Sequence, residues 1–428
     1  MSTQMTIALL ILVLCFIIRM PIGLGLLVTS FSYMLMIGRD PSIIAEVFCS
    51  KMFNNFILIA VPLFIFAANI MNSSKVTEKI FGFSQILVGR WKGGLGHVNV
   101  IASLIFSGMT GSAVADASGL GIMEIDSMRK EGYDDKFSAA ITACSAVIGP
   151  IFPPSIPLVI YGVIAGASIG NLFMAGMVPG VMLAVALCCY VAYIANKRSY
   201  PRGQVFHGRE LAIMIISAIP ALLTPVILLV GIYTGITTAT EAGAIAALYA
   251  LLISIFGYRT LSHQQFLTVI KNTVRSTGQI GIMLGSAYAF SYIVNVENLP
   301  RIAGQFIEST VSSATSFLII CNIVLLILGM LVDSAVLQLV LLPILCPIAA
   351  SYGIDMVHFG VVFTLNTMIG LCTPPFGMLL FIVTGISKAP MADIVKDTLP
   401  MVGCMLLVLI IITFVPQSIM WVPALFGF

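Results

Sequence analysis

Charged side chains are scarce in this sequence. Only 9% of the 428 residues are Asp, Glu, Lys or Arg, whereas 59% are apolar. A soluble domain carries about 25% charged residues, so this composition excludes an ordinary soluble protein. Mean hydropathy is +1.10, and apolar runs long enough to cross a bilayer recur along the chain. We expect an all-α membrane protein that crosses the bilayer several times.

Several functional classes lack the residues that they need. The formal net charge of +3 is too small to indicate nucleic-acid binding. The four histidines lie far apart and the nine cysteines include no C-x-x-C pair, so we expect neither a metal cluster of these residues nor an organic cofactor. The sequence contains no P-loop, which argues against an ATP-driven pump. The first basic residue is Arg19, so the N-terminus lacks the basic start of a cleavable signal peptide.

A polar island at residues 107–118 interrupts the apolar sequence. It reads S-G-M-T-G-S-A-V-A-D-A-S, and the apolar flanks at 95–106 and 119–128 are each too short to span a bilayer. Backbone that leaves the helix at membrane depth must be buried in protein or line a watery cavity. Such a broken segment is typical of a binding site in a secondary transporter. The alternative is an ordinary loop between two spans.

Positions 221 residues apart carry matching landmarks. Gly149 corresponds to Gly370, and Pro153-Pro154 corresponds to Pro374-Pro375. One match is weak evidence because Gly and Pro are common in membrane helices, but several sets at one offset indicate an internal repeat of residues 51–196 and 272–417. The other sets are Gly108-Met109 with Gly329-Met330, Gly132 and Asp134 with Gly353 and Asp355, and Pro179 with Pro400.

Each half also contains a proline-broken apolar segment. These segments are residues 149–155, read as G-P-I-F-P-P-S, and residues 370–376, read as G-L-C-T-P-P-F. Proline has no N–H and clashes with the preceding turn, so the Pro-Pro pair breaks the helix. The break leaves carbonyls on one side and N–H groups on the other without partners. Carbonyls suit a hard cation such as sodium, and helix N-termini suit a carboxylate.

The sequence predicts six consecutive regions built around the two repeats. We expect a re-entrant helical hairpin followed by a broken helix in each half. The regions are N-terminal scaffold helices at 1–94, the first hairpin and broken helix at 95–170, scaffold helices with an interfacial amphipathic arm at 171–277, a scaffold helix and connection at 278–313, the second hairpin and broken helix at 314–390, and a C-terminal helix at 391–428.

Charge distribution predicts that the repeats are inverted relative to each other. If both hairpins re-enter the membrane, five spans separate the two islands, and an odd number reverses the second half. Placing the basic loop at 196–210 in the cytoplasm puts 16 of the 20 Lys and Arg residues on that side, as the positive-inside rule requires. This test does not separate re-entrant from crossing hairpins.

Two ionisable residues at membrane depth mark a candidate site. Asp116 and Asp333 lie in or beside an island, and such residues are functional by default. The hydroxyls of Thr110, Ser112 and Ser155 gather at the same points. The alternatives are that Asp333 only caps a helix, that Asp116 is a structural hydrogen-bond acceptor inside the tip, and that the hydroxyls only bond to the preceding turn. No Arg or Lys falls in these segments, which favours a monoanionic substrate.

At these residues the chain resembles the large membrane subunit of the tripartite ATP-independent periplasmic (TRAP) transporters. The match rests on G-M-T-G-S-A-V-A-D-A-S and G-P-I-F-P-P-S-I-P, with R-M-P-I-G at 19–23 and M-V-P-G at 177–180. The resemblance implies an elevator-type fold like that of the ion-transporter superfamily, in a bacterial inner membrane. It implies sodium-driven import of an organic acid, with a periplasmic substrate-binding protein, a small four-helix membrane subunit and membrane lipid as partners. The hairpins and broken helices would form its moving transport domain.

The resemblance also assigns ligand residues by motif, with two or more sodium sites. The first sodium site would comprise Ser107, Gly149, Phe152 and Pro154. The second would comprise Gly329, Asp333, Gly370, Thr373 and Phe376. Substrate would contact Thr110, Ser112, Asp116, Ser155 and Asp333.

The substrate itself stays open at this stage. The hydroxyl-rich, arginine-free tips favour sialic acid, and a C4-dicarboxylate or another sugar acid is the alternative. A stand-alone sodium–carboxylate symporter of related fold would need no binding protein. An intramembrane aspartyl protease would use the two aspartates, but its Y-D and G-x-G-D motifs do not surround Asp116 or Asp333. We therefore expect a transporter and not an enzyme.

Overall fold

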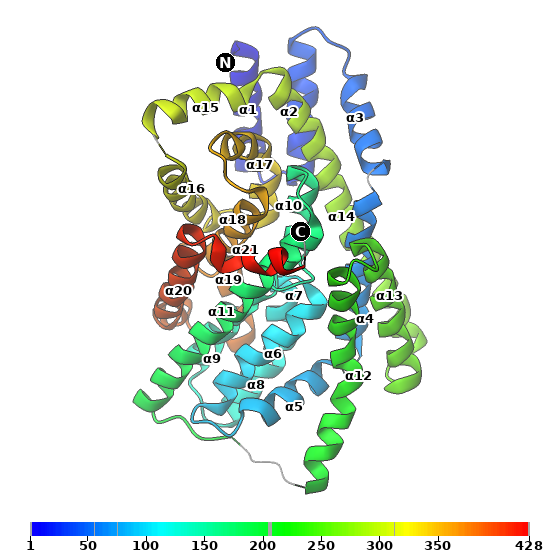
Figure 1. Cartoon of the computed structure of the whole chain (residues 1–428), viewed down its shortest axis with the longest axis vertical. Coiled ribbons are helices and arrows are strands. Elements are labelled where there is room, and N and C mark those ends of the chain that lie inside the picture. The colour runs from blue at the N-terminus through cyan, green and yellow to red at the C-terminus, as the bar shows by residue number, and fades with distance from the viewer. Residues whose placement is uncertain (1, 55, 75, 204–207, 312, 427–428) are drawn as a thin grey trace.

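A computed structural model describes residues 2–54, 56–74, 76–203, 208–311 and 313–426, and these residues form helices without a β-strand (Figure 1). The elements are α1 (Thr3–Ile17), α2 (Ile22–Met36), α3 (Ser42–Phe53), η1 (Phe56–Ile59), α4 (Ala60–Ser73), α5 (Val76–Val88), α6 (Gly94–Thr110), α7 (Ala113–Ser118), α8 (Leu120–Lys130), α9 (Asp135–Ser145), η2 (Ala146–Ile148), α10 (Ile156–Ala165), α11 (Ile169–Lys197), α12 (Gly208–Tyr233), α13 (Ala239–Leu252), η3 (Ile253–Gly257), α14 (His263–Val296), α15 (Leu299–Thr310), α16 (Ala314–Gly329), α17 (Ser334–Ser351), α18 (Met356–Gly370), α19 (Met378–Ser387), α20 (Met391–Phe414) and α21 (Gln417–Leu425).

The outer surface of the helices is apolar. On α12, for example, Ile213, Ile216, Leu223 and Val230 are all more than one third exposed. Within the described ranges, six helices are long and apolar enough to cross a membrane: Ile169–Lys197, Gly208–Tyr233, Ala239–Gly257, His263–Val296, Ser334–Ser351 and Met391–Phe414. Apolar side chains on the outer surface fit a protein that is surrounded by the lipid bilayer.

The two halves repeat element by element at the offset of 221. In the first half, the hairpin of α6 with α7 and α8 is followed by the broken helix of α9, η2 and α10 and then by α11. In the second half, the hairpin of α16 and α17 is followed by the broken helix of α18 and α19 and then by α20. The Pro153-Pro154 and Pro374-Pro375 peptide bonds are cis. This order of elements agrees with the predicted repeat, and the details of the repeat stay a prediction.

The two hairpins lie towards opposite ends of the molecule. In Figure 1, α6 and α8 lie below the middle of the view, and α16 and α17 lie above it. The arms of each hairpin pack together, and each hairpin packs on the broken helix of its own half. This arrangement agrees with the predicted inversion, which stays a prediction with respect to the membrane.

Three boundaries differ from the sequence expectation. The island at 107–118 is mostly helical: α6 runs through Thr110, and the helix is interrupted only at Gly111 and Ser112. The boundary expected at 277/278 falls inside α14, which runs unbroken for 34 residues. The amphipathic arm and the following span are thus one helix. The connection expected within 278–313 contains a helix, α15.

The buried apolar side chains form two clusters. The larger cluster contains the hairpins, the broken helices, α11 and α20. The smaller cluster joins α1, α2 and α14 and includes Ile160 from α10 and Leu339 from α17. These two residues therefore mark a boundary where the repeat elements contact α14. In Figure 1, α2, α3 and α14 lie to the right of α16, α18 and α20.

Candidate functional site

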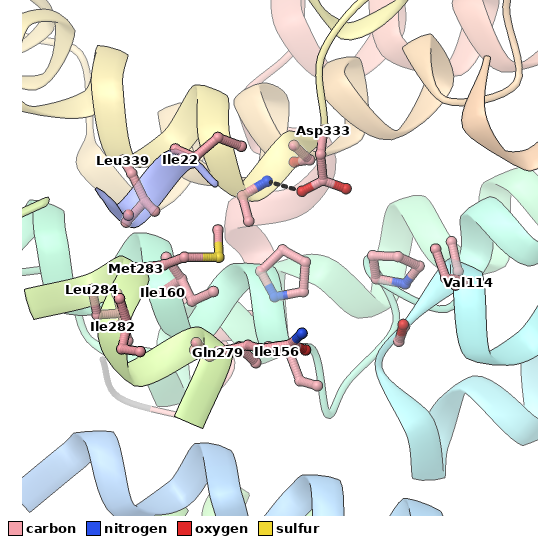
Figure 2. Close-up of a pocket in the computed structure, with 18 of the residues that line it drawn as sticks. Ile22, Val114, Ile156, Ile160, Gln279, Ile282, Met283, Leu284, Asp333 and Leu339 are labelled. Atoms are coloured by element: carbon pink, nitrogen blue, oxygen red, sulfur yellow. Dashed lines mark hydrogen bonds between the residues drawn. The ribbon is translucent and has the colours of Figure 1, made fainter. Parts of the chain in front are cut away.

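A cavity of about 520 Å³ lies where the two halves meet the N-terminal helices (Figure 2). Small-molecule sites typically measure roughly 300–1,000 Å³. The tip of the first hairpin contributes Ser112 and Val114, and the start of α17 contributes Asp333. The other lining residues come from the segment before α2 and its start (Pro21, Ile22, Gly23, Leu24), the remaining tip residues (Gly111, Ala113), the first broken helix (Pro150, Ile156, Pro157, Ile160), α14 (Gln279, Ile280, Ile282, Met283, Leu284) and the second half (Ser334, Ala335, Leu339, Met368, Leu371).

Asp333 is held at the cavity as the N-cap of α17. Its carboxylate accepts a hydrogen bond from the backbone N–H of Ala335 at 2.8 Å, the dashed line in Figure 2. The capping role considered from the sequence is therefore confirmed, and it fixes the side chain at the mouth of an 18-residue helix. The same helix start carries a partial positive charge that stabilises an anion.

Ser112 is the second polar residue of the predicted set that reaches the cavity. Its hydroxyl caps α7 by accepting from the N–H of Ala115 at 3.4 Å. Ser334 also lines the cavity, and its hydroxyl lies 2.7 Å from that of Thr367 on α18. No Lys or Arg is among the described residues that line the cavity. The site therefore offers hydroxyls, amide groups and one carboxylate.

Thr110 and Ser155 lie next to the helix breaks but do not line the cavity. The Ser155 hydroxyl donates to the Pro150 carbonyl and accepts from the N–H of Leu158 at 3.1 Å, which caps α10. Thr110 is 2% exposed, and its hydroxyl has no hydrogen-bond partner in the described part of the chain. A buried polar oxygen without a partner is costly, so Thr110 is suited to a ligand at the break.

Asp116 is not among the cavity-lining residues, and its predicted contact with substrate finds no support in this geometry. It is 1% exposed and faces the interior of the first hairpin, near a second buried acid, Glu124. Both belong to a polar cluster in which Asn99 donates to Thr142 at 2.7 Å and Ser145 donates to Asn99 at 2.7 Å. The physical reason is helical phase, because Asp116 follows Val114 by two residues on α7, so it lies on the side of the helix opposite the cavity-lining Val114.

Sequence reasoning missed Glu124 and Gln279. The stretch at 119–128 counts as an apolar flank by average hydropathy, which conceals the two acidic residues within it, Glu124 and Asp126. Gln279 is the polar residue at the start of an apolar part of α14, and it lines the cavity (Figure 2). A search for acidic and amide side chains within the apolar segments would have found both.

The backbone around the first predicted sodium site is tightly packed. Gly111 has a φ of 58°, and a Cβ atom there would overlap the carbonyl oxygen of Pro154. Gly149 lies against the backbone of Ser112, and Ser107 donates its hydroxyl to the Leu104 carbonyl at 2.5 Å. Phe152 lies against Gly180. The structure thus brings Gly149 and Pro154 to the break at 111–112, which directly follows Thr110 in the chain.

The second predicted sodium site is built in the same way. A Cβ atom at Gly370 would lie 2.5 Å from the carbonyl carbon of Gly329. The N–H of Gly377 donates to the Met330 carbonyl at 3.3 Å. Thr373 donates its hydroxyl to Ile369 at 2.7 Å, which is the back-bonded alternative. The Phe376 side chain is 57% exposed, so only its backbone could take part in a buried site.

The oxygen set at both breaks fits a hard monovalent cation. Carbonyl and hydroxyl oxygens are the ligands that such ions take where membrane helices are unwound. The described residues contain no group of three or more His, Cys, Asp or Glu that could hold a metal ion. Sodium occupancy stays a prediction.

Comparison with known proteins decides the family. Residues 9–418 match the family described as "Tripartite ATP-independent periplasmic transporter, DctM component". The chain belongs to this family. It is 40% identical over 407 residues to the sialic acid TRAP transporter large permease protein SiaM of Vibrio cholerae, covering 95% of each protein.

Two further DctM relatives differ in the substrate that their names give. The sialic acid TRAP transporter permease protein SiaT of Haemophilus influenzae is 39% identical, covering 99% of this chain and 69% of SiaT. The C4-dicarboxylate TRAP transporter large permease protein DctM of Rhodobacter capsulatus is 32% identical, covering 95% of this chain and 96% of DctM. This DctM-family chain is thus a transporter subunit and not an enzyme, and a multi-pass protein of the bacterial inner membrane.

A solved structure shares the fold. The Alcanivorax borkumensis YdaH transporter, described as having an unusual topology, superimposes with a TM-score of 0.67 over 87% of this chain and 86% of that one. Sequence identity is only 10%, so the likeness concerns the fold alone. It supports the all-helical architecture predicted for the DctM-family chain.

Proposed function

We propose that this chain is the large membrane subunit of a sodium-driven TRAP importer for an organic acid, with sialic acid as the first candidate. The observation that carries the proposal is the cavity bounded by Ser112, Asp333 and Gln279. It touches both hairpins at their helix breaks, so a ligand there contacts both halves at once. Broken helices around a central ligand are the recurring design of secondary transporters.

The polar groups of the cavity favour a hydroxyl-rich monoanion. The Asp333 carboxylate accepts hydrogen bonds from hydroxyl and N–H groups of a substrate and repels a second carboxylate. The positive dipole at the start of α17 already stabilises the Asp333 carboxylate, so a substrate carboxylate needs a cation as its partner. A C4-dicarboxylate would leave one charge without a cationic partner. Two of the relatives carry sialic acid in their names, which agrees with this preference.

Sodium would supply the positive charge that the lining side chains lack. The first ion would be held at the break of α6 by backbone oxygens of residues 107–112 and 149–154. The second would be held between Gly329–Asp333 and the loop at 370–376. Sodium ions at these breaks would stabilise the conformation of the tips that surrounds the substrate. Binding of sodium and binding of substrate would therefore be coupled.

The proposed movement is an elevator of the hairpins and broken helices against α2 and α14. The smaller apolar cluster joins these groups through Ile160 and Leu339. Apolar contacts are non-directional, so two apolar surfaces can slide past each other without breaking buried hydrogen bonds. A small four-helix membrane subunit and a periplasmic binding protein would complete the system.

Uptake into proteoliposomes tests this function. The chain is reconstituted with its small subunit, and radiolabelled sialic acid is supplied with or without the binding protein and an inward sodium gradient. We expect uptake only when both are present, and competition by unlabelled sialic acid but not by succinate. Uptake with sodium alone would favour the stand-alone symporter. Uptake without a sodium gradient would overturn sodium coupling, and competition by succinate would favour a C4-dicarboxylate.

A further inference from the structure

A second cavity, of about 550 Å³, lies between α6 and α11 and shares no residue with the first. One wall is α6 with Ile101 and Leu104, and the other is α11 from Val181 to Asn196. At 1.5 Å per residue, this stretch of α11 measures about 22 Å. Val181 and Val185 are exposed, so the groove opens on the apolar surface that faces lipid.

One end of this groove is polar and basic. Trp91, Lys92, His97 and Asn196 line it there, whereas apolar residues and two cysteines line the remainder. The loop before α6 is held to the loop after α11 by hydrogen bonds from Gly93 N–H to the Pro201 carbonyl and from Gly203 N–H to the Gly89 carbonyl, each 3.0 Å. The backbone of Lys92 forms an isolated antiparallel bridge with that of Arg202, which does not itself line the groove. No Asp or Glu is among the described lining residues.

The His97 side chain provides an independent sign of a ligand. It is 2% exposed, lines the groove, and its Nδ1 atom has no hydrogen-bond partner in the part of the chain that the structure describes. The Trp91 ring packs edge-on against it, with ring centroids 5.2 Å apart. An unsatisfied buried nitrogen costs free energy, and an oxygen atom of a ligand at this end would remove that cost.

We propose that this groove is a binding site for an anionic phospholipid. The phosphate lies at Lys92 and His97, and one acyl chain lies along Ile101, Leu104 and Val185. Charge and shape select this occupant, because the groove is apolar along its length and cationic at one end only. The basic end belongs to connections that the sequence places in the cytoplasm, and anionic lipid is concentrated in that leaflet. Trp91 is typical of side chains at the headgroup level.

Trp91 can report on the lipid because the chain has only two tryptophans. The full chain carrying Trp421→Phe is reconstituted in phosphatidylcholine bilayers. Equal small fractions of acyl-brominated phosphatidylglycerol or acyl-brominated phosphatidylcholine are added, and quenching of Trp91 fluorescence is measured. We expect phosphatidylglycerol to be preferred about fivefold, the factor expected from one Lys at an anionic headgroup. Equal quenching by the two lipids would overturn the proposal.

Variants separate the site from general lipid attraction. Lys92→Gln should abolish the preference, whereas Lys271→Gln on α14 removes a charge from the same predicted membrane side and should leave it unchanged. Ala192→Phe should also abolish the preference for phosphatidylglycerol, because Ala192 is exposed on α11 and a ring there blocks the groove without disturbing the core.

A second control uses the other tryptophan. Trp91→Phe leaves Trp421 on α21 as the fluorescent reporter, and both brominated lipids should quench it equally. A preference unchanged by Lys92→Gln would contradict the site.

Discussion

At the scale of single residues, Asp333 combines two roles that substitution can separate. Its carboxylate caps α17 and also lines the cavity. Asn caps a helix about as well as Asp, whereas Ala costs about 1 kcal/mol. We expect Asp333→Asn to keep the thermal stability of the wild type but lower sialic acid uptake at least about tenfold, because the charge-assisted hydrogen bonds to substrate are lost. Asp333→Ala should lower both. Wild-type uptake by the Asn variant would remove Asp333 from the substrate site.

Thr373 tests the second sodium site at the same scale. In the wild type, the Thr373 hydroxyl donates to the Ile369 carbonyl. Thr373→Val keeps the shape of the side chain but removes this hydroxyl. We expect the sodium concentration for half-maximal uptake to rise about tenfold if that hydroxyl turns to the ion. Thr398→Val is the control, because Thr398 bonds back to Ile394 in the same way on α20. An unchanged sodium dependence in Thr373→Val would exclude its hydroxyl as a ligand.

At the scale of elements, the hairpin tip depends on Gly111. This residue has a positive φ, and a Cβ atom would overlap Pro154. Gly111→Ala must therefore push the tip away from the broken helix, so we expect loss of sodium-dependent uptake. Gly403→Ala on α20 meets no atom within 4 Å and should be neutral or slightly stabilising. Full uptake by Gly111→Ala, compared in the same assay, would show that the close approach is unnecessary.

The sequence predicted the repeat well and the site only partly. Glycine and proline landmarks recur because they mark helix breaks, and breaks are local features that sequence records. The hairpins, the broken helices and the positions of Ser112 and Asp333 followed from them. The burial of Asp116 away from the cavity depends on the phase of a six-residue helix, which tertiary packing sets. The contribution of Gln279 depends on contact between segments that are distant in sequence.

At the scale of the whole molecule, transport should require the hairpins to slide against α14. A mercury bridge between Ile160→Cys and Leu284→Cys joins α10 to α14 across the cavity, since both residues line it. We expect the bridge to abolish uptake and a thiol reductant to restore it. The control joins Gly25→Cys to the native Cys15, because a Cβ at Gly25 lies 3.2 Å from the Cβ of Cys15 and both belong to the predicted scaffold. Undiminished uptake with the first bridge would argue against the elevator.

The central claim is that the cavity between the hairpin tips is the sodium-dependent substrate site. Thiol labelling of Ala335→Cys tests it most directly, because Ala335 lines the cavity and is partly accessible. Native Cys49, exposed on α3 outside the cavity, serves as internal control. We predict that sialic acid slows labelling at position 335 in sodium but not in potassium, with Cys49 unaffected. Labelling at position 335 that sialic acid does not slow in sodium would contradict the account.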